Sequence, residues 1–264
     1  VSFWTTAVFA VIERVEPDPG PEDDWTPDDL PELTTGAVSL LCCGLLLPAL
    51  MVPAVQAARE AAERVESMNR MKEINEAVLD FQKVYKRLPI VGEDAAGNRP
   101  NLSWRVDILR YIGYESLYDQ FHHDEPWDSE HNRSLIPLMP PIYQNPSVAE
   151  EGKTNYLAAT GPGAVFQDGR PVQLRKITDG TANTIWLVEA DADQAVEWTR
   201  PDDWEFDPND QWRGLGGLRP GVVLVAFLDG SVRAIETSTS DEDLKALITR
   251  DGGERVDLPD VKPM

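Results

Sequence analysis

One stretch limits the folds open to this chain more than any other: residues 36–58 read GAVSLLCCGLLLPALMVPAVQAA, without a charged side chain. About 20 apolar residues are enough for a helix to cross the hydrocarbon core of a bilayer. A buried helix of a soluble domain is the alternative, but the run has no polar face. A cleavable signal peptide fits poorly, because no basic segment leads into the run. We therefore expect a transmembrane helix over residues 36–58, with bilayer contact beginning at Ala37 and ending at Ala58.

The segment before this run, residues 1–35, has two parts. Residues 1–12 are apolar but too short to cross a bilayer, so a second membrane contact there is left open. Residues 13–33 hold nine acidic residues, one basic residue (Arg14) and five prolines. Proline in a helix interior removes a hydrogen bond and clashes with the preceding turn. We therefore expect an extended, solvated linker.

A second helical segment, residues 59–88, follows the apolar run and contains neither proline nor glycine. Its apolar residues recur at spacings of three and four, which is typical of a helix with one buried face. They are Val65, Met68, Met71, Ile74, Val78, Phe81 and Val84. We expect an amphipathic stalk whose apolar stripe packs against the head, and we expect Pro89 to end it.

The remaining residues, 89–264, have the pattern of a globular head. Short helices with aromatic anchors are expected within residues 103–121. Four runs rich in Val, Leu, Ile and aromatic residues predict strands. These runs are residues 154–160, 184–190, 221–228 and 231–236.

Two local signals refine the end of the chain. The dipeptide Asp229-Gly230 lies between the last two expected strands and predicts a two-residue type I′ turn. Ser240 is placed to cap a final short helix in residues 241–249. A long N-terminal helix followed by an antiparallel sheet gives an α+β fold.

The order of several motifs resembles a pilin-like family that is expanded in planctomycetes. The motifs include PAVQAAREAAERV, MKEI, SWRVDILRYI, LYDQFHHDEPWDSEHN, TNYLAATGPGAVF, ITDGTANTIWLVEA and GLGGLRPGVVLVAFLDGSVRAI, which together span roughly residues 50–253. The family is similar to type II secretion pseudopilins in its N-terminal helix and sheet, and its biochemical function is not established. The resemblance implies a pilin-like head outside the cytoplasm, and a solute-binding label given to some members is a weak hint of ligand binding.

The chain also departs from that family at four places. Residues 33–38 lack the glutamate of a prepilin processing signal, so entry into a filament by the usual route is in doubt. Many relatives carry one cysteine in the stalk and another before Pro-Ser in the head, where this chain has Ser67 and Asn145. Losing both cysteines together is what the loss of one bridge would look like. The family's C-terminal signature, His, nine residues, Asp-Gly, has Arg219 in place of the histidine.

Residues 122–131 are a first candidate metal site, because His, Asp and Glu are all capable ligands. The candidate ligands are His122, His123, His131, Asp124, Glu125 and Asp128. Their spacing matches no established zinc pattern. The competing interpretation is structural: Asp128 and Asn132 cap turns, and Trp127 anchors the segment in the core.

A second acidic tract, residues 191–210, suggests calcium, since oxygen-rich loops bind this ion and some pseudopilins do so near the sheet. The candidate calcium ligands are Asp191, Asp193, Asp207 and Asp210. The tract lacks the DxDxDG spacing of a calcium loop. A solvated loop pinned by Trp198, Trp204 and Trp212 is the alternative, and we expect no other cofactor.

Composition and motifs together restrict the function. The chain has 24 Lys and Arg against 46 Asp and Glu, a net charge of −22, which argues against a nucleic-acid partner. No GxSxG, HExxH, P-loop or GxGxxG motif occurs, so we expect no enzyme.

The expected function is that of a membrane-anchored extracytoplasmic protein with a structural or protein-interaction role in the cell envelope. Its expected partners are other envelope or pseudopilin-like proteins. A membrane-tethered module that binds calcium or a small solute is the alternative. The stalk's basic residues, among them Arg59 and Arg64, taken alone favour a cytoplasmic head. We expect the head outside the cytoplasm, as the resemblance implies, because Glu60 and Glu63 balance the charge of these basic residues.

Overall fold

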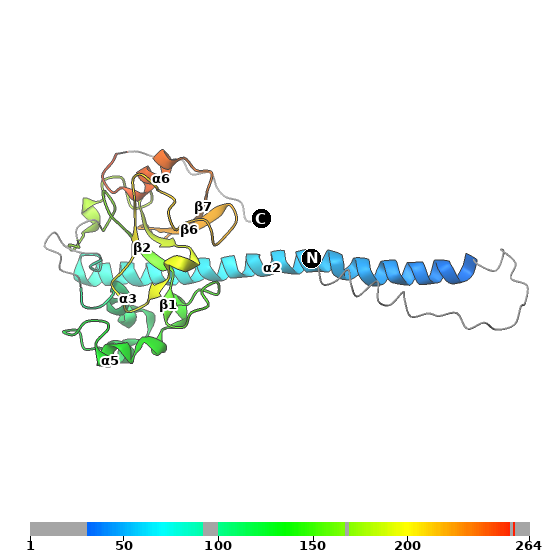
Figure 1. Ribbon diagram of the computed structural model, residues 1–264. Coiled ribbons are helices and arrows are strands. Elements are labelled where there is room, and N and C mark those ends of the chain that lie inside the picture. The colour runs from blue at the N-terminus through cyan, green and yellow to red at the C-terminus, as the bar shows by residue number, and fades with distance from the viewer. Residues whose placement is uncertain (1–30, 92–99, 167–168, 254–255, 257–264) are drawn as a thin grey trace, which may run out of the picture. The chain divides into compact units, whose positions relative to one another are not determined.

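A computed structural model describes residues 31–91, 100–166, 169–253 and 256, with only the backbone described for residues 31–54 (Figure 1). The chain divides into two compact units, residues 1–57 and 58–264. Our expectations for residues 1–30, a short apolar segment and an acidic linker, lie outside the described residues. The fold that can be analysed in detail is therefore that of the second unit.

Helix α2 runs from Pro31 to Tyr85 as one continuous element. It begins inside the segment that we expected to be extended, and the proline does not prevent this. At the first helical position a proline lacks only an N–H that has no intrahelical partner anyway. At the other end, α2 stops three residues before the predicted Leu88. Lys86 adopts a left-handed conformation with φ 59°, and Leu88 N donates to Val172 O at 2.7 Å.

No helix among the residues with described side chains is long and apolar enough to cross a membrane. Most of the apolar run, residues 36–54, falls outside that set.

The apolar stripe of α2 is shorter than the sequence predicted. Met71, Ile74, Val78 and Phe81 are buried and belong to the main core, with Met68 packed beside them. Val65 and Val84, by contrast, are 57% and 62% exposed. A step of three residues falls about 60° short of a full turn in a helix with 3.6 residues per turn. The repeated steps of three from position 65 to position 74 therefore rotate the earliest member off the buried face.

The head contains a five-stranded sheet in the order β5-β2-β3-β6-β7 and a two-stranded sheet, β1-β4. All neighbours are antiparallel except β2 and β5, which are parallel. The strands are β1 Lys153–Thr154, β2 Tyr156–Thr160, β3 Ile185–Glu189, β4 Val196–Glu197, β5 Trp204–Glu205, β6 Val222–Phe227 and β7 Val232–Glu236. All four predicted strands are present and the α+β class is confirmed. The sequence did not predict β4 and β5, which have two residues each.

Short helices complete the second unit. They are α3 Trp104–Asp107, η2 Leu109–Ile112, α4 Glu115–Tyr118, α5 Glu130–Arg133, η3 Ile136–Leu138, η4 Pro141–Tyr143, η5 Leu174–Lys176, η6 Ala192–Gln194 and α6 Asp241–Ile248. The helices expected within residues 103–121 are confirmed. The cap of α6 is confirmed as well, because Ser240 Oγ accepts a hydrogen bond from Asp243 N at 3.1 Å.

Strands β2, β3 and β6 of the five-stranded sheet are buried on both faces, whereas the edge strand β7 is only partly buried. Alternate residues of β6 belong to two cores: Leu224 contributes to the core that contains α2, and Val223 contributes to the core that contains Leu244 and Leu247 of α6. Helix α2 thus covers one face of the sheet and α6 the other (Figure 1). Burial on both faces explains why residues 184–190 and 221–228 read as nearly continuous apolar runs.

The turn between β6 and β7 corrects a prediction. A type I′ turn needs a positive φ at both central residues. Among the described residues, Lys86 is the only non-glycine residue with a positive φ, so Asp229 does not have one. Instead Gly230 N donates to Phe227 O at 3.2 Å, Gly230 has φ 97°, and Phe227 N donates to Ser231 O at 2.9 Å. This is a three-residue loop closed by a left-handed glycine.

Candidate functional site

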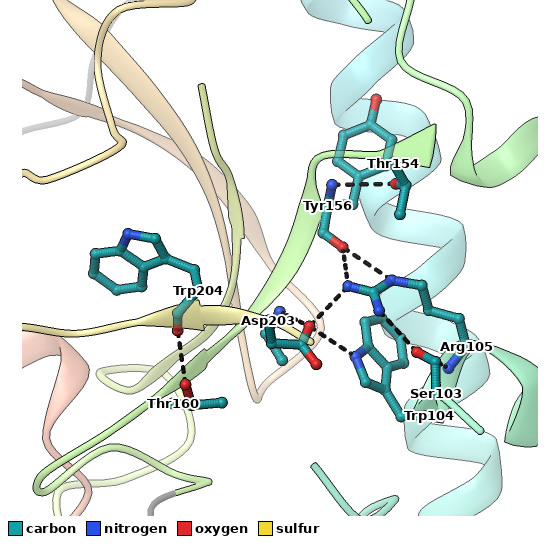
Figure 2. Close-up of polar contacts among 9 residues, drawn as sticks. Ser103, Trp104, Arg105, Thr154, Tyr156, Thr160, Asp203 and Trp204 are labelled. Atoms are coloured by element: carbon teal, nitrogen blue, oxygen red, sulfur yellow. Dashed lines mark hydrogen bonds and ion pairs between the residues drawn. The ribbon is translucent and has the colours of Figure 1, made fainter. Parts of the chain in front are cut away.

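A buried ion pair joins α3 to the segment that enters β5. Arg105 Nη2 donates to Asp203 Oδ1 at 2.7 Å, and both side chains are almost fully buried. The same guanidinium donates to the carbonyl oxygen of Tyr156 in β2, through Nη2 at 2.9 Å and Nε at 3.3 Å. Figure 2 shows the guanidinium held between that carbonyl and the carboxylate of Asp203.

Further donors complete this network. Asp203 Oδ1 also accepts from Trp104 Nε1 at 3.1 Å and from Ala158 N at 2.8 Å. Burial raises the pKa of the Asp203 carboxyl, although Arg105 opposes the rise. Asp203 Oδ2 is buried and has no hydrogen-bond partner in the described part of the chain. Because both charged groups are withdrawn from solvent, the network serves to fix α3, β2 and β5 together.

A second buried network centres on Glu189 at the end of β3. Arg219 pairs with this carboxylate in a bidentate manner, Nε to Oε2 at 2.8 Å and Nη2 to Oε1 at 2.9 Å. Asn145 Nδ2 donates to Glu189 Oε1 at 2.7 Å, and Arg219 Nη2 donates to Ser67 Oγ of α2 at 2.9 Å. The Tyr156 hydroxyl is buried close to this group, and burial raises its pKa while an interaction with Ser67 opposes the rise.

The residues of the second network coincide with the departures noted in the sequence. Ser67, Asn145 and Arg219 are three positions that the sequence analysis singled out. Asn145 and Arg219 both bond to Glu189, and Ser67 joins the cluster through Arg219. The sequence analysis linked Ser67 with Asn145 through the lost bridge, but it had no signal that placed Arg219 or Glu189 beside them. This cluster ties α2 to the sheet through charge and hydrogen bonds.

The histidine segment forms a compact surface turn. The rings of His122 and His131 stack with centroids 3.6 Å apart, and His122 Nδ1 lies 2.9 Å from Glu125 Oε1. His123 is directed elsewhere, with Nε2 3.2 Å from the carbonyl oxygen of Tyr118. Hydrogen bonds from Ser129 and His122 lower the pKa of the exposed Glu125.

The centre of this turn is Asn132, which is fully buried. Its Nδ2 donates to the carbonyl oxygens of His122, Glu125 and Pro126 at 3.0, 3.2 and 3.1 Å. The geometry therefore favours the structural interpretation for Asn132. Asp124 and Asp128 are not brought into the stacked pair by any hydrogen bond or ion pair described for this segment.

The four predicted calcium ligands are divided between two places. Asp191 Oδ1 accepts from Gly217 N at 2.7 Å and from Leu218 N at 2.9 Å, so it holds the glycine-rich loop before β6. Asp207 and Asp210 form an isolated backbone bridge, and Asp207 Oδ2 lies 3.4 Å from Arg213 Nη1. Asp193 lies in η6.

Within the described ranges, no three His, Cys, Asp or Glu side chains are grouped so that they could hold a metal ion. Calcium binding by the acidic tract stays an untested prediction. The tryptophans of the tract do anchor it: Trp198 Nε1 donates to Ile136 O at 2.9 Å, and Trp204 Nε1 donates to Arg213 O at 2.8 Å.

An open groove lies on the surface of α2. Its volume is about 440 Å³, and one wall is a row of α2 side chains while the other comes from η2, the turn after it, and η4. The lining residues are Glu73, Glu76, Ala77, Asp80, Tyr111, Ile112, Tyr114, Pro141 and Ile142. We call this feature the carboxylate–tyrosine groove.

These features define the class of the protein. It is an α+β head built on the C-terminal part of a long N-terminal helix and held together by buried hydrogen bonds and ion pairs. Residues 56–159 match a family model described as a protein of unknown function, DUF1559. The matched range runs from α2 into β2 and contains Ser67, Arg105 and Asn145, whereas Glu189 and Arg219 lie beyond it. No curated protein and no solved structure matched the chain.

Proposed function

We propose that this chain is a non-enzymatic, membrane-anchored protein with a pilin-like head outside the cytoplasm, and that it has a structural or protein-interaction role in the cell envelope. The observation that carries the proposal is the continuity of α2. One helix, Pro31–Tyr85, contains the uncharged residues 36–58 and also supplies Met71, Ile74 and Phe81 to the core of the head. A helix of this kind can hold a folded head at a bilayer.

The pairing of buried charged side chains in the head supports the proposal that the protein is not an enzyme. The buried charges of Arg105, Asp203, Glu189 and Arg219 are paired with one another inside the two networks. Catalytic acids and bases instead meet at a site that a substrate can reach. The pairing here favours a scaffold role over chemistry.

Membrane fractionation of the full chain, produced in a bacterium, tests the anchor. We expect the chain in the membrane fraction after an alkaline carbonate wash. A variant carrying Leu45→Arg and Leu46→Arg should move to the soluble fraction, because charged side chains at the centre of a span are costly. The matched control places the same two changes at exposed positions of α2, Val65→Arg and Val84→Arg, and should stay in the membrane.

The side of the membrane needs a separate measurement. Protease added to intact spheroplasts should digest the head if it lies outside the cytoplasm. Wild-type chain in the soluble fraction would overturn the anchor, and a protected head in a membrane-bound chain would overturn only the orientation.

A further inference from the structure

The carboxylate–tyrosine groove presents negative charge that the described chain does not neutralise. Glu73 and Glu76 are exposed, and neither has a hydrogen-bond or ion-pair partner among the described residues. Asp80, the third carboxylate of the groove, pairs with Lys83 at 2.8 Å. Among the described residues that line the groove there is no lysine or arginine. A ligand there would meet two unpaired carboxylates one helical turn apart.

The opposite wall adds aromatic surface. Tyr111 and Tyr114 line the groove together with Pro141 and Ile142. Aromatic ring faces attract ammonium and guanidinium groups, and tyrosine is enriched at protein interfaces. The wall therefore suits side chains that combine an apolar stem with a positive end, as lysine and arginine do.

Aromatic packing links the groove to the end of α2 through the buried Phe81, and Arg87 Cζ lies 5.4 and 5.7 Å from the centroids of the Phe81 and Tyr85 rings. The Tyr111 ring lies 6.0 Å from the Phe81 ring, which lies 4.4 Å from the Tyr85 ring, measured between centroids. Tyr85 is 50% exposed, and Val84 beside it is also exposed. Exposed aromatic and aliphatic side chains next to a concave surface are typical of a docking site.

We propose that the carboxylate–tyrosine groove docks a basic segment of a partner protein, with lysine or arginine side chains paired to Glu73 and Glu76. Charge complementarity argues for this occupant over an apolar or acidic one, and the chain's net charge of −22 would steer a basic partner toward it. This inference rests on the protein-interaction role proposed above and names the chemistry of the partner.

The test uses the full chain in detergent and a fluorescent octapeptide of alternating lysine and leucine, with binding followed by anisotropy at physiological salt. The variant Glu73→Gln/Glu76→Gln should weaken binding about tenfold, since each exposed ion pair contributes under about 1 kcal/mol. The matched control, Glu151→Gln/Glu242→Gln, removes two exposed carboxylates away from the groove and should change affinity less than twofold.

Three outcomes would overturn the inference. Equal losses in the two variants would mean that the peptide responds only to overall charge, and no binding by the wild type would remove the site. Tight binding of a glutamate–leucine octapeptide would point to an apolar site without charge selection. None of these results would affect the membrane fractionation, so a failure of the groove is distinguishable from a failure of the proposed function.

Discussion

Asp107, in α3, is partly buried, and burial raises the pKa of its carboxyl from 3.8 to about 6 while Arg87 opposes the rise. The unfolded chain releases this proton near pH 4, and the folded chain holds it until about pH 6. Between these values the folded state binds more protons than the unfolded state. Stability therefore falls as pH rises through this window, and the loss is complete above pH 6.

Replacing Asp107 with asparagine should remove that dependence. We expect Asp107→Asn to raise the free energy of unfolding by about 1–2 kcal/mol at pH 7 and to leave it nearly unchanged at pH 4. Urea denaturation at unit steps from pH 4 to pH 8 gives the comparison. Glu151→Gln, at an exposed position, should follow the wild type throughout. Parallel pH profiles for Asp107→Asn and wild type would contradict the assignment.

Arg219 and Glu189 should show strong coupling. Arg219→Met leaves a buried carboxylate without its counter-ion and should cost about 3–5 kcal/mol of unfolding free energy. Glu189→Gln should also destabilise, because it leaves the buried arginine unpaired. The double variant Arg219→Met/Glu189→Gln has no buried charge here and should recover most of the loss. Denaturant titration of all four proteins closes the cycle, and additive losses would show that the pair is not coupled.

At the scale of elements, α2 carries both fully buried and largely exposed valines. Val78 is 1% exposed within the main core, whereas Val84 is 62% exposed. Val78→Asp should abolish cooperative unfolding, since it buries an unpaired charge. Val84→Asp should stay within about 0.5 kcal/mol of wild type. Thermal melting followed by circular dichroism compares the two, and equal melting temperatures would refute the packing of α2.

The strands illustrate which elements a sequence can predict. β2, β3, β6 and β7 have five or six residues each, and the first three are strongly apolar, so the pattern was sufficient. β4 and β5 have two residues each, and their pairing depends on partners outside the segment itself. The position of the turn at Asp229 was predicted correctly, but its type was not. The Asp-Gly dipeptide does not determine how many residues the loop contains.

At the scale of the whole molecule, α2 is part of the head's core. Besides its apolar stripe, Asn75 Nδ2 donates to Phe227 O at 2.8 Å and Asn75 Oδ1 accepts from Trp186 Nε1 at 3.0 Å. The sequence divided stalk from head at residues 88 and 89, whereas residues 58–264 form one compact unit. The head therefore needs the stalk to complete its fold.

Two fragments test this dependence. Residues 58–264 should fold and melt cooperatively. Residues 86–264 lack Met71, Ile74, Val78 and Phe81, expose one face of the sheet, and should bind a hydrophobic dye without a cooperative transition. Near-ultraviolet circular dichroism and dye fluorescence provide the readout. A cooperative transition in the shorter fragment, at the temperature of the longer one, would show that the stalk is dispensable.

The sequence by itself determined what local periodicity and composition control: the uncharged run, the amphipathic helix, four strands, the cap of α6 and the α+β class. Tertiary structure alone decided the polar contacts that join distant positions. Arg105 meets Asp203 98 residues away, and Arg219 meets Ser67 152 residues away. A buried charge needs a partner, but no local pattern names it, because pairing depends on how helix α2 and the sheet are brought together.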